Sequence, residues 1–292
     1  MGVQRWIEKN ASSLAGKTVA ITGSTGGLGK ALCRHLAALG ATLVLVNRSA
    51  ARSEAHAKEL RARYGTEVHC VIADMEDKAQ VFAAAEALSK LPLDVLVLNA
   101  GAYSIPRHAC STGLDNVFQI NFLSPYLLTR ALLPHLRARN ARVVAVSSIA
   151  HDYSKTDKGD VDFSTRSRAS LVYGNAKRHL TYALAALFEK EQEASLAITH
   201  PGITPTGITA HYPKVIYALI KYPMRVIFMC PERAALCVLA GVLAPTAPGT
   251  WVGPCLFGVW GYPRARRLNS ADASERAHIA RVAEELWLLH RE

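Results

Sequence analysis

The sequence predicts an α/β protein, a doubly wound parallel sheet with helices on both faces. Short, almost continuous apolar runs alternate with longer amphipathic stretches along most of the chain. Unbroken apolar runs are typical of parallel strands that helices cover on both sides. A glycine cluster also follows the first apolar run and leads into a helical pattern, and polar side chains follow several of the other runs. This order of elements is that of repeated strand–helix–strand units.

Each apolar run is interpreted as a strand and each amphipathic stretch as a helix. The predicted strands are Thr18–Ile21, Thr42–Val46, Val68–Ile72, Val95–Leu98, Arg142–Val146, Leu196–Thr199 and Trp251–Gly253. The predicted helices are Gly29–Leu39, Arg52–Tyr64, Lys78–Leu88, Leu114–Arg137, Leu171–Glu193, Pro231–Leu243 and Ser274–Leu289, the last with Ser274 as its N-cap. Residues 1–16 are expected to be an amphipathic lead-in, and 150–170 a polar loop. With no repeat or linker in the sequence, residues 1–292 are expected to form one domain.

The composition and charge of the chain argue against several classes of protein. The chain has 292 residues, half of them apolar, and a formal net charge of +11. No apolar run is long enough for a membrane-spanning helix, and no secretory signal is recognised, so a cytoplasmic protein is expected. The six cysteines form no C-x-x-C pair, and no metal site is expected. The longest basic cluster is Arg264, Arg266 and Arg267, too short for a nucleic-acid arm, so nucleic acid is not an expected partner.

The stretch KTVAITGSTGGLG, residues 17–29, has the layout of a phosphate-binding turn. The pattern is TG-x3-G-x-G, formed by Thr22, Gly23, Gly27 and Gly29. Glycine allows a tight turn and a close approach of a ligand, and a helix N-terminus favours negative charge. The turn is therefore predicted to bind the pyrophosphate of a dinucleotide. The alternative is a glycine-rich turn that binds no ligand.

The residues after the second predicted strand indicate which dinucleotide. An acidic residue near this point binds the ribose hydroxyl of NAD, whereas an arginine accommodates the 2′-phosphate of NADP. This chain has Asn47 followed by Arg48, whose planar guanidinium suits a phosphate. NADP(H) is therefore favoured over NAD(H), the alternative being that Arg48 is only a solvated loop residue.

Tyr173 and Lys177 are four residues apart, so on a helix they share a face. An ammonium group beside a phenol favours the phenolate, and we expect Lys177 to lower the pKa of Tyr173 and suit it to acid–base catalysis. Ser148 ends the fifth predicted strand, where its hydroxyl can hydrogen-bond a substrate carbonyl. Ser147 is the competing candidate for that role.

In this combination the chain resembles the short-chain dehydrogenases/reductases, over about residues 16–207. TGSTGGLG matches the family's TGxxxGxG, LNAG at 98–101 matches NNAG with Leu98 in place of the first Asn, and YGNAK at 173–177 matches Tyr-x3-Lys. The segments QINFLSPYLL, VSSIAH and HPGITPT match the remaining pieces of the family pattern. The resemblance implies a Rossmann fold and a catalytic tetrad of Asn121, Ser148, Tyr173 and Lys177. It implies cofactor binding by Thr22, Gly23, Ser24, Thr25, Gly27, Leu28, Gly29, Asn47, Arg48, Asp74, Met75, Asn99, Ala100, Gly101, Tyr173, Lys177, Pro201, Gly202, Ile203 and Thr206.

The VSSIAH segment and the long gap before Tyr173 are most similar to the retinol-dehydrogenase and WW-domain-oxidoreductase-like branch. That resemblance implies an NADP(H)-dependent oxidoreductase for a hydrophobic alcohol or carbonyl. The alternative is a nucleotide-binding scaffold or redox sensor without turnover. Residues 208–292 are expected to supply an apolar substrate lid and C-terminal helices. The run His211–Cys230 and the stretch Gly258–Arg267 are candidates for peripheral membrane contact, and a homodimer is a further expectation.

Overall fold

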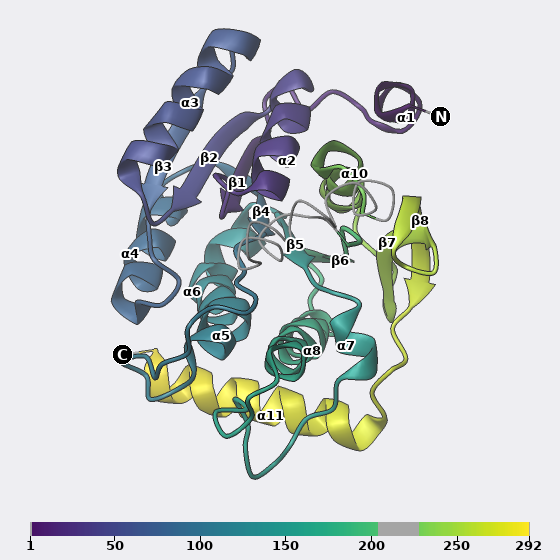
Figure 1. The fold of residues 1–292 in the computed structure, drawn as a ribbon. Coiled ribbons are helices and arrows are strands. Elements are labelled where there is room, and N and C mark those ends of the chain that lie inside the picture. Colours follow the sequence, from purple (N-terminus) through teal and green to yellow (C-terminus); the bar gives the residue numbers. More distant parts are fainter. Residues whose placement is uncertain (1, 204–227, 292) are drawn as a thin grey trace, which may run out of the picture.

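The computed structural model describes residues 2–203 and 228–291, and within them an eight-stranded sheet lies between two layers of helices (Figure 1). The strand order is β3-β2-β1-β4-β5-β6-β7-β8. All neighbouring strands are parallel except β7 and β8, which are antiparallel. The doubly wound α/β prediction is confirmed.

The strands coincide closely with the apolar runs of the sequence. They are β1 Thr18–Thr22, β2 Thr42–Asn47, β3 Val68–Ile72, β4 Leu93–Leu98, β5 Arg142–Val146, β6 Ser195–Thr199, β7 Thr250–Leu256 and β8 Trp260–Arg267. Every residue of β1 is buried. Side chains of successive strand residues point to opposite faces, so a strand that is covered on both sides must be apolar throughout.

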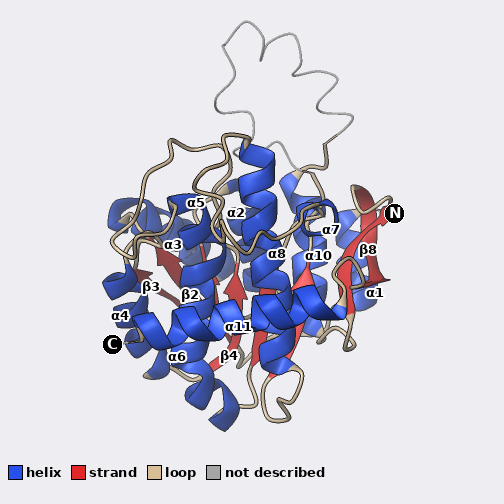
Figure 2. Ribbon diagram, turned by 90° about the horizontal axis from the view of Figure 1, so that it is seen from below, coloured by secondary structure: helices blue, strands red, loops and turns tan. Residues whose placement is uncertain are grey.

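The helices divide into two groups, each burying an apolar face against one side of the sheet. The first core contains side chains from α1 Val3–Asn10, α2 Gly27–Ala38, α3 Ala50–Tyr64 and α10 Pro231–Leu243. The second contains side chains from α4 Lys78–Ser89, α6 Ser124–Ala138, α8 Ala169–Phe188 and α11 Ala273–His290. Figure 2 shows α11 crossing the outer surface of the second layer.

Four local predictions are wrong in detail, three of them in helices. The predicted helix Leu114–Arg137 is broken into α5 Asn116–Phe118, a π-helical turn η1 Gln119–Leu123, and α6. The predicted loop 150–170 contains the short helix α7 Ala150–Tyr153. The N-cap of α11 is Asp272, whose carboxylate accepts from Glu275 N, and not Ser274.

The fourth difference is the strand β8, which follows the stretch predicted as the last strand, Trp251–Gly253. It pairs with β7 through a register that runs from Thr250 opposite Arg267 to Leu256 opposite Trp260. Because β7 is parallel to β6, the turn between β7 and β8 lies at the carboxyl edge of the sheet. This is the edge at which ligands bind in folds of this kind. The predicted lid run His211–Cys230 lies mostly outside the described residues.

Candidate active site

The glycine turn between β1 and α2 is a close-packed anion cradle. Gly23 has a φ of +67°, and a Cβ at Gly29 would lie 2.5 Å from the carbonyl oxygen of Gly23. The N-cap of α2 is Gly26, which has no side chain to cap the helix. Gly27, Leu28 and Gly29 form the first turn of α2, so their backbone N–H groups are available to a phosphate.

Thr22 and Asn99 fasten this turn to β4. The hydroxyl of Thr22 accepts hydrogen bonds from Asn99 N at 3.0 Å and from Ala100 N at 2.9 Å. The Asn99 amide donates back to the carbonyls of Thr22 and Gly23, at 2.9 and 3.1 Å. A Cβ at Gly23 would lie 2.9 Å from Ala100 Cα, so only glycine allows the two strand ends to approach this closely.

Asn47 is turned into the protein. Its Oδ1 accepts from Thr25 N at 3.2 Å, and its Nδ2 donates to Ser24 Oγ at 2.8 Å and to Ser53 Oγ at 2.9 Å. Asn47 is 5% exposed and Ser24 is fully buried. The side chains of these two predicted cofactor-binding residues therefore hold the turn in shape from behind.

A cavity of about 160 Å³ lies between α2 and α3, beside the turn. It is lined by Thr25, Lys30, Arg52, Ala55, His56 and Glu59. The Arg52 guanidinium donates to the carbonyl of Thr25 at 3.4 Å, which anchors it at the mouth of the glycine turn. Arg48 is exposed directly after β2. Two arginines four residues apart thus flank the point where β2 ends, and the sequence pattern singles out only the first.

The remaining predicted cofactor residues lie along the same edge of the sheet. Asp74 follows β3, and its carboxylate accepts from Glu76 N at 3.0 Å. Met75 is 7% exposed, with its side chain in the core. Pro201 and Gly202 follow β6 and are buried, and Ile203 is partly buried. Thr206 lies outside the described residues.

Asn121 lies in the middle of the π-helical turn η1 and is completely buried. Its amide donates to the carbonyls of Ala102 and Val117, both at 2.8 Å, and its Oδ1 accepts from Ala102 N at 3.2 Å. A Cβ at Gly101 would lie 2.8 Å from Asn121 Oδ1 and 3.5 Å from Lys177 Nζ. Gly101 therefore leaves room for both the Asn121 amide and the Lys177 ammonium near the end of β4. Single π turns of this kind are frequent at functional sites.

The two serines after β5 have different surroundings. Ser147 is 2% exposed, and its hydroxyl lies 2.6 Å from Thr181 Oγ1 behind the sheet edge. Ser148 is only partly buried, and its hydroxyl shares a hydrogen bond with Tyr173. Of the two candidates, Ser148 is the one that faces the tyrosine.

Tyr173 and Lys177 lie on one face of α8, as predicted, but the expected effect on the phenol is not present. Burial raises the pKa of Tyr173 to about 12, and the hydrogen bond with Ser148 opposes this only in part. The Lys177 ammonium lies 5.8 Å from the centre of the Tyr173 ring and donates to the carbonyl of Val146 at 3.0 Å. Burial also lowers the pKa of Lys177 to about 8. The prediction that Lys177 lowers the pKa of Tyr173 is wrong for this arrangement, because the ammonium points to a backbone carbonyl and desolvation dominates.

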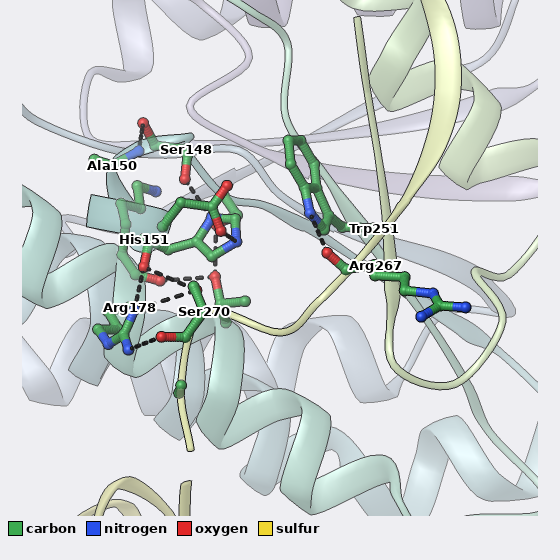
Figure 3. A network of polar contacts seen from close by, with 12 residues as sticks. Ser148, Ala150, His151, Arg178, Trp251, Arg267 and Ser270 are labelled. Carbon is green, nitrogen blue, oxygen red and sulfur yellow. Dashed lines mark hydrogen bonds and ion pairs between the residues drawn. The ribbon is translucent and has the colours of Figure 1, made fainter. Parts of the chain in front are cut away.

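Several residues around Tyr173 have no signal in the sequence. Tyr103 packs its ring edge-on against Tyr173, with centroids 5.3 Å apart. Tyr153, on α7, acts on the Tyr173 phenol electrostatically and helps to raise its pKa. His151 packs behind Ser148 in a network that reaches Arg178 and Ser270 (Figure 3). These residues come from separate elements, so only the fold brings them together.

One group of metal-ligating side chains occurs among the described residues, formed by Glu76, His108 and Cys110. His108 Nε2 lies 3.0 Å from Glu76 Oε2, and His108 Nδ1 accepts from the Asn116 amide at 3.1 Å. The imidazole therefore uses both nitrogens within the protein, as the donor to Glu76 and the acceptor from Asn116. The imidazole is thus hydrogen-bonded at both nitrogens by Glu76 and Asn116.

Known proteins combine the same sequence pattern and fold. A family model described as short chain dehydrogenase matches residues 17–159. Mouse retinol dehydrogenase 12 is 30% identical over 268 residues, which cover 89% of this chain and 84% of that protein. The chain belongs to the short-chain dehydrogenase/reductase family. It is an oxidoreductase that acts on CH–OH groups, and the family resemblance stated from the sequence is confirmed.

Other relatives and solved structures are similar to this chain over most of its length. Mouse polyprenol dehydrogenase is 29% identical over 248 residues, which cover 80% of this chain and 73% of that protein. A solved structure of an uncharacterised protein from Mycobacterium paratuberculosis superposes with a TM-score of 0.74 at 25% identity, and the match covers 95% of both chains. The NADP complex of RhlG from Pseudomonas aeruginosa superposes with a TM-score of 0.61 at 26% identity, over 80% of this chain and 91% of that one. Among the described residues of the short-chain dehydrogenase, no helix is both long and apolar enough to cross a membrane.

Proposed function

We propose that this protein is an NADP(H)-dependent reductase or dehydrogenase for a hydrophobic alcohol–carbonyl pair. The observation that carries the proposal is the meeting of Ser148, Tyr173, Lys177 and Asn121 at one edge of the sheet, beside the glycine turn. The hydrogen bond between Ser148 and Tyr173 joins two elements, the end of β5 and helix α8. Binding of a nucleotide alone requires no such pair, so the arrangement favours catalysis over the scaffold alternative.

The residues present fit a dinucleotide. The first turn of α2 offers uncapped N–H groups for a pyrophosphate, and Gly101 keeps the space in front of Asn121 and Lys177 open. Bound there, the nicotinamide would donate or accept the hydride, and the protein supplies the position and the proton. Thr22, Gly23 and Asn99 would hold the cofactor side of the site, and Pro201 and Gly202 would form its floor after β6.

Tyr173 is the group proposed to exchange the proton. With a pKa of about 12 its hydroxyl keeps its proton at neutral pH, which suits the donation of a proton to a carbonyl oxygen as charge develops there. Ser148 hydrogen-bonds the same hydroxyl and is placed to orient the substrate oxygen. Lys177, buried beside the phenol ring, would hold the cofactor ribose.

The surroundings of Tyr173 support an apolar substrate. The ring of Tyr103 lies edge-on against the phenol, and the backbone at Gly258, in the β7–β8 turn, approaches the side chain of Ile149. The tip of that turn exposes Leu256 to 51% and Phe257 to 89%. The printed names of the relatives, retinol and polyprenol dehydrogenases, are consistent with long apolar alcohols as substrates. Peripheral contact of the exposed tip with a lipid surface stays a prediction.

The cavity between α2 and α3 supports the preference for NADP(H). A 2′-phosphate is strongly anionic, and this cavity is lined by Lys30 and Arg52, with Arg48 exposed at the end of β2. The guanidinium group matches the geometry of a phosphate. No acidic side chain stands directly after β2, where a carboxylate would repel the phosphate.

A fluorescence titration of the purified protein with NADPH and NADH tests this assignment. Wild type should bind NADPH more tightly, and Arg48→Ala and Arg52→Ala should each weaken NADPH by about 10- to 100-fold while leaving NADH nearly unchanged, because one charge-assisted hydrogen bond is worth about 1.5–3 kcal/mol. Arg63→Ala, at the far end of α3, is the matched control and should alter neither. Equal losses for both cofactors, or a preference of wild type for NADH, would refute the phosphate-binding role of these arginines.

A further inference from the structure

The N-terminal end of α11 contacts helix α8, which carries Tyr173, and also the segment that follows Ser148. Arg178, on α8, is 1% exposed, and it pairs through Nε and Nη2 with the two carboxylate oxygens of Glu275 at 2.7 and 2.6 Å. Such a two-point pair fixes the orientation of both side chains. Glu275 therefore joins the first turn of α11 to the helix of Tyr173 and Lys177.

The same arginine also holds the segment that follows Ser148. Its Nη1 donates to the carbonyl of His151, and its Nη2 donates to the carbonyl of Ser270 at 2.7 Å. Ser270 Oγ donates to the His151 carbonyl at 3.3 Å. His151 Nδ1 in turn donates to the carbonyl of Ser148 at 2.5 Å (Figure 3). A continuous chain of hydrogen bonds thus runs from Glu275 to the backbone of Ser148.

Glu275 has a second connection to this segment. Its Oε1 accepts from both the backbone N and the hydroxyl of Thr156, each at 3.1 Å, beyond the end of α7. The segment 148–156 is therefore held near its middle through Arg178 and at its end through Glu275. His151 itself is fully buried, with the Trp251 ring edge-on at 5.4 Å between centroids, so it has no freedom to turn away.

We propose that Arg178, Glu275, Ser270 and His151 are positioning residues, which form a clamp that sets Ser148 against Tyr173. The C-terminal helix then contributes to catalysis although Glu275 does not reach the reacting atoms. Ser148 and Tyr173 belong to different elements. Helix α7 packs on α8 at Gly174, and this contact is steric only, so it does not fix the orientation of one element relative to the other. The clamp adds the directional contacts that fix one element against the other. This inference rests on the proposed catalytic roles of Ser148 and Tyr173.

The test is Glu275→Gln in the full-length protein, with Glu284→Gln as its control. Glu284 lies on the same helix and pairs with Arg130 of α6 at 3.0 Å, so the control breaks an ion pair of α11 away from the site. We expect Glu275→Gln to lower kcat about tenfold while KM and the Kd of NADPH stay within about twofold, since a small misplacement of a catalytic group lowers turnover rather than binding. Glu284→Gln should leave kcat within about twofold of wild type. Glu275→Asp, which keeps the charge, should recover part of the loss.

Hydrogen exchange supplies a readout that does not depend on turnover. Amides in residues 148–156 should exchange faster in Glu275→Gln and remain as in wild type in Glu284→Gln. If Glu275→Gln does not fold, Ser270→Ala removes the Ser270 hydroxyl from His151 and should give a smaller effect in the same direction. Equal kcat and equal exchange in the Glu275 and Glu284 variants would overturn the clamp. A wild-type protein without turnover on any apolar carbonyl would instead contradict the proposed function, and the exchange result would still decide the clamp.

Discussion

At the scale of single residues, the site is organised by burial more than by charge. Lys177 is 3% exposed and Tyr173 lies among other tyrosine rings, so both lose the water that would stabilise their charged forms. Burial raises the pKa of the phenol and lowers that of the ammonium, to about 12 and about 8. Around neutral pH both groups hold their protons, the state required for proton donation to a carbonyl.

Replacing Tyr173 by Phe removes one hydroxyl and keeps the ring. We expect kcat to fall by about 10²- to 10⁴-fold, the usual contribution of a positioned general acid, while the affinity for NADPH is retained. Steady-state kinetics and a fluorescence titration measure the two quantities. Tyr103→Phe removes a hydroxyl from the neighbouring ring and is the control. Turnover of Tyr173→Phe within a few-fold of wild type would show that another group exchanges the proton.

The sequence predicts that Tyr173 and Lys177 share a helix face, but it does not predict their ionisation. The Tyr-x3-Lys spacing indicates a shared helix face, and both residues lie on α8. The spacing carries no information about the direction of the ammonium, which the carbonyl of Val146 determines from another element. The same holds for Asn47, whose place after the second strand is predictable but whose inward orientation depends on Ser53 of α3.

At the scale of elements, the contact of α7 with α8 depends on one missing side chain. Gly174 follows Tyr173, and a Cβ there would overlap Ser154 Oγ and lie 3.3 Å from the carbonyl of Ala150. The close approach of these helices brings the segment after Ser148 onto the helix of Tyr173. The π turn η1 acts similarly for Asn121, by turning its amide toward the carbonyl of Ala102.

Gly174→Ala should therefore push α7 away from α8. We expect a loss of about 1–3 kcal/mol in the free energy of unfolding, the usual cost of overpacking, together with a reduced kcat. Urea denaturation and steady-state kinetics measure the two effects. Ser154→Ala in the same chain removes the hydroxyl that the new methyl meets and should restore part of both. Stability unchanged by Gly174→Ala would mean that α7 is held loosely.

Element boundaries are predictable where the pattern is long and apolar, as in α10, whose observed bounds Pro231–Leu243 match the prediction. The sequence pattern misses strand β8 because WGYPRARR contains glycine, proline and three arginines, a composition unusual for a strand. Its pairing with β7 is a tertiary effect. The predicted N-cap of α11 lies two residues late because Asp272 and Ser274 are both good capping residues.

At the scale of the whole molecule, stability depends on histidines that fold into the core without charge. His200 is 3% exposed and His179 is completely buried against the rings of Phe118 and Phe122. Burial lowers the pKa of His200 to about 3 and that of His179 to about 4. An unfolded chain would protonate both near a pH of about 6.5, so acid favours the unfolded state.

The free energy of unfolding should thus be highest above a pH of about 6.5 and fall as the pH is lowered from there toward about 4. Each histidine contributes a slope of about 1 kcal/mol per pH unit in this range. Urea denaturation at several pH values between neutrality and mild acid measures the slope. His200→Gln has no group that titrates there and should show a shallower slope than wild type, whatever its stability at neutral pH. Parallel curves for the two proteins would show that His200 changes its charge alike in the folded and unfolded states.

The antiparallel strand β8 also has a consequence for how copies of this protein meet. An outermost strand presents unpaired N–H and C=O groups and can template pairing with a neighbouring molecule, the first step of aggregation. Here Pro263 has no N–H to donate, and exposed Arg264 and Arg267 place like charges along the strand. The β8 strands of two molecules brought side by side would repel each other. The strand that ends the sheet on this side therefore also discourages self-association by strand addition.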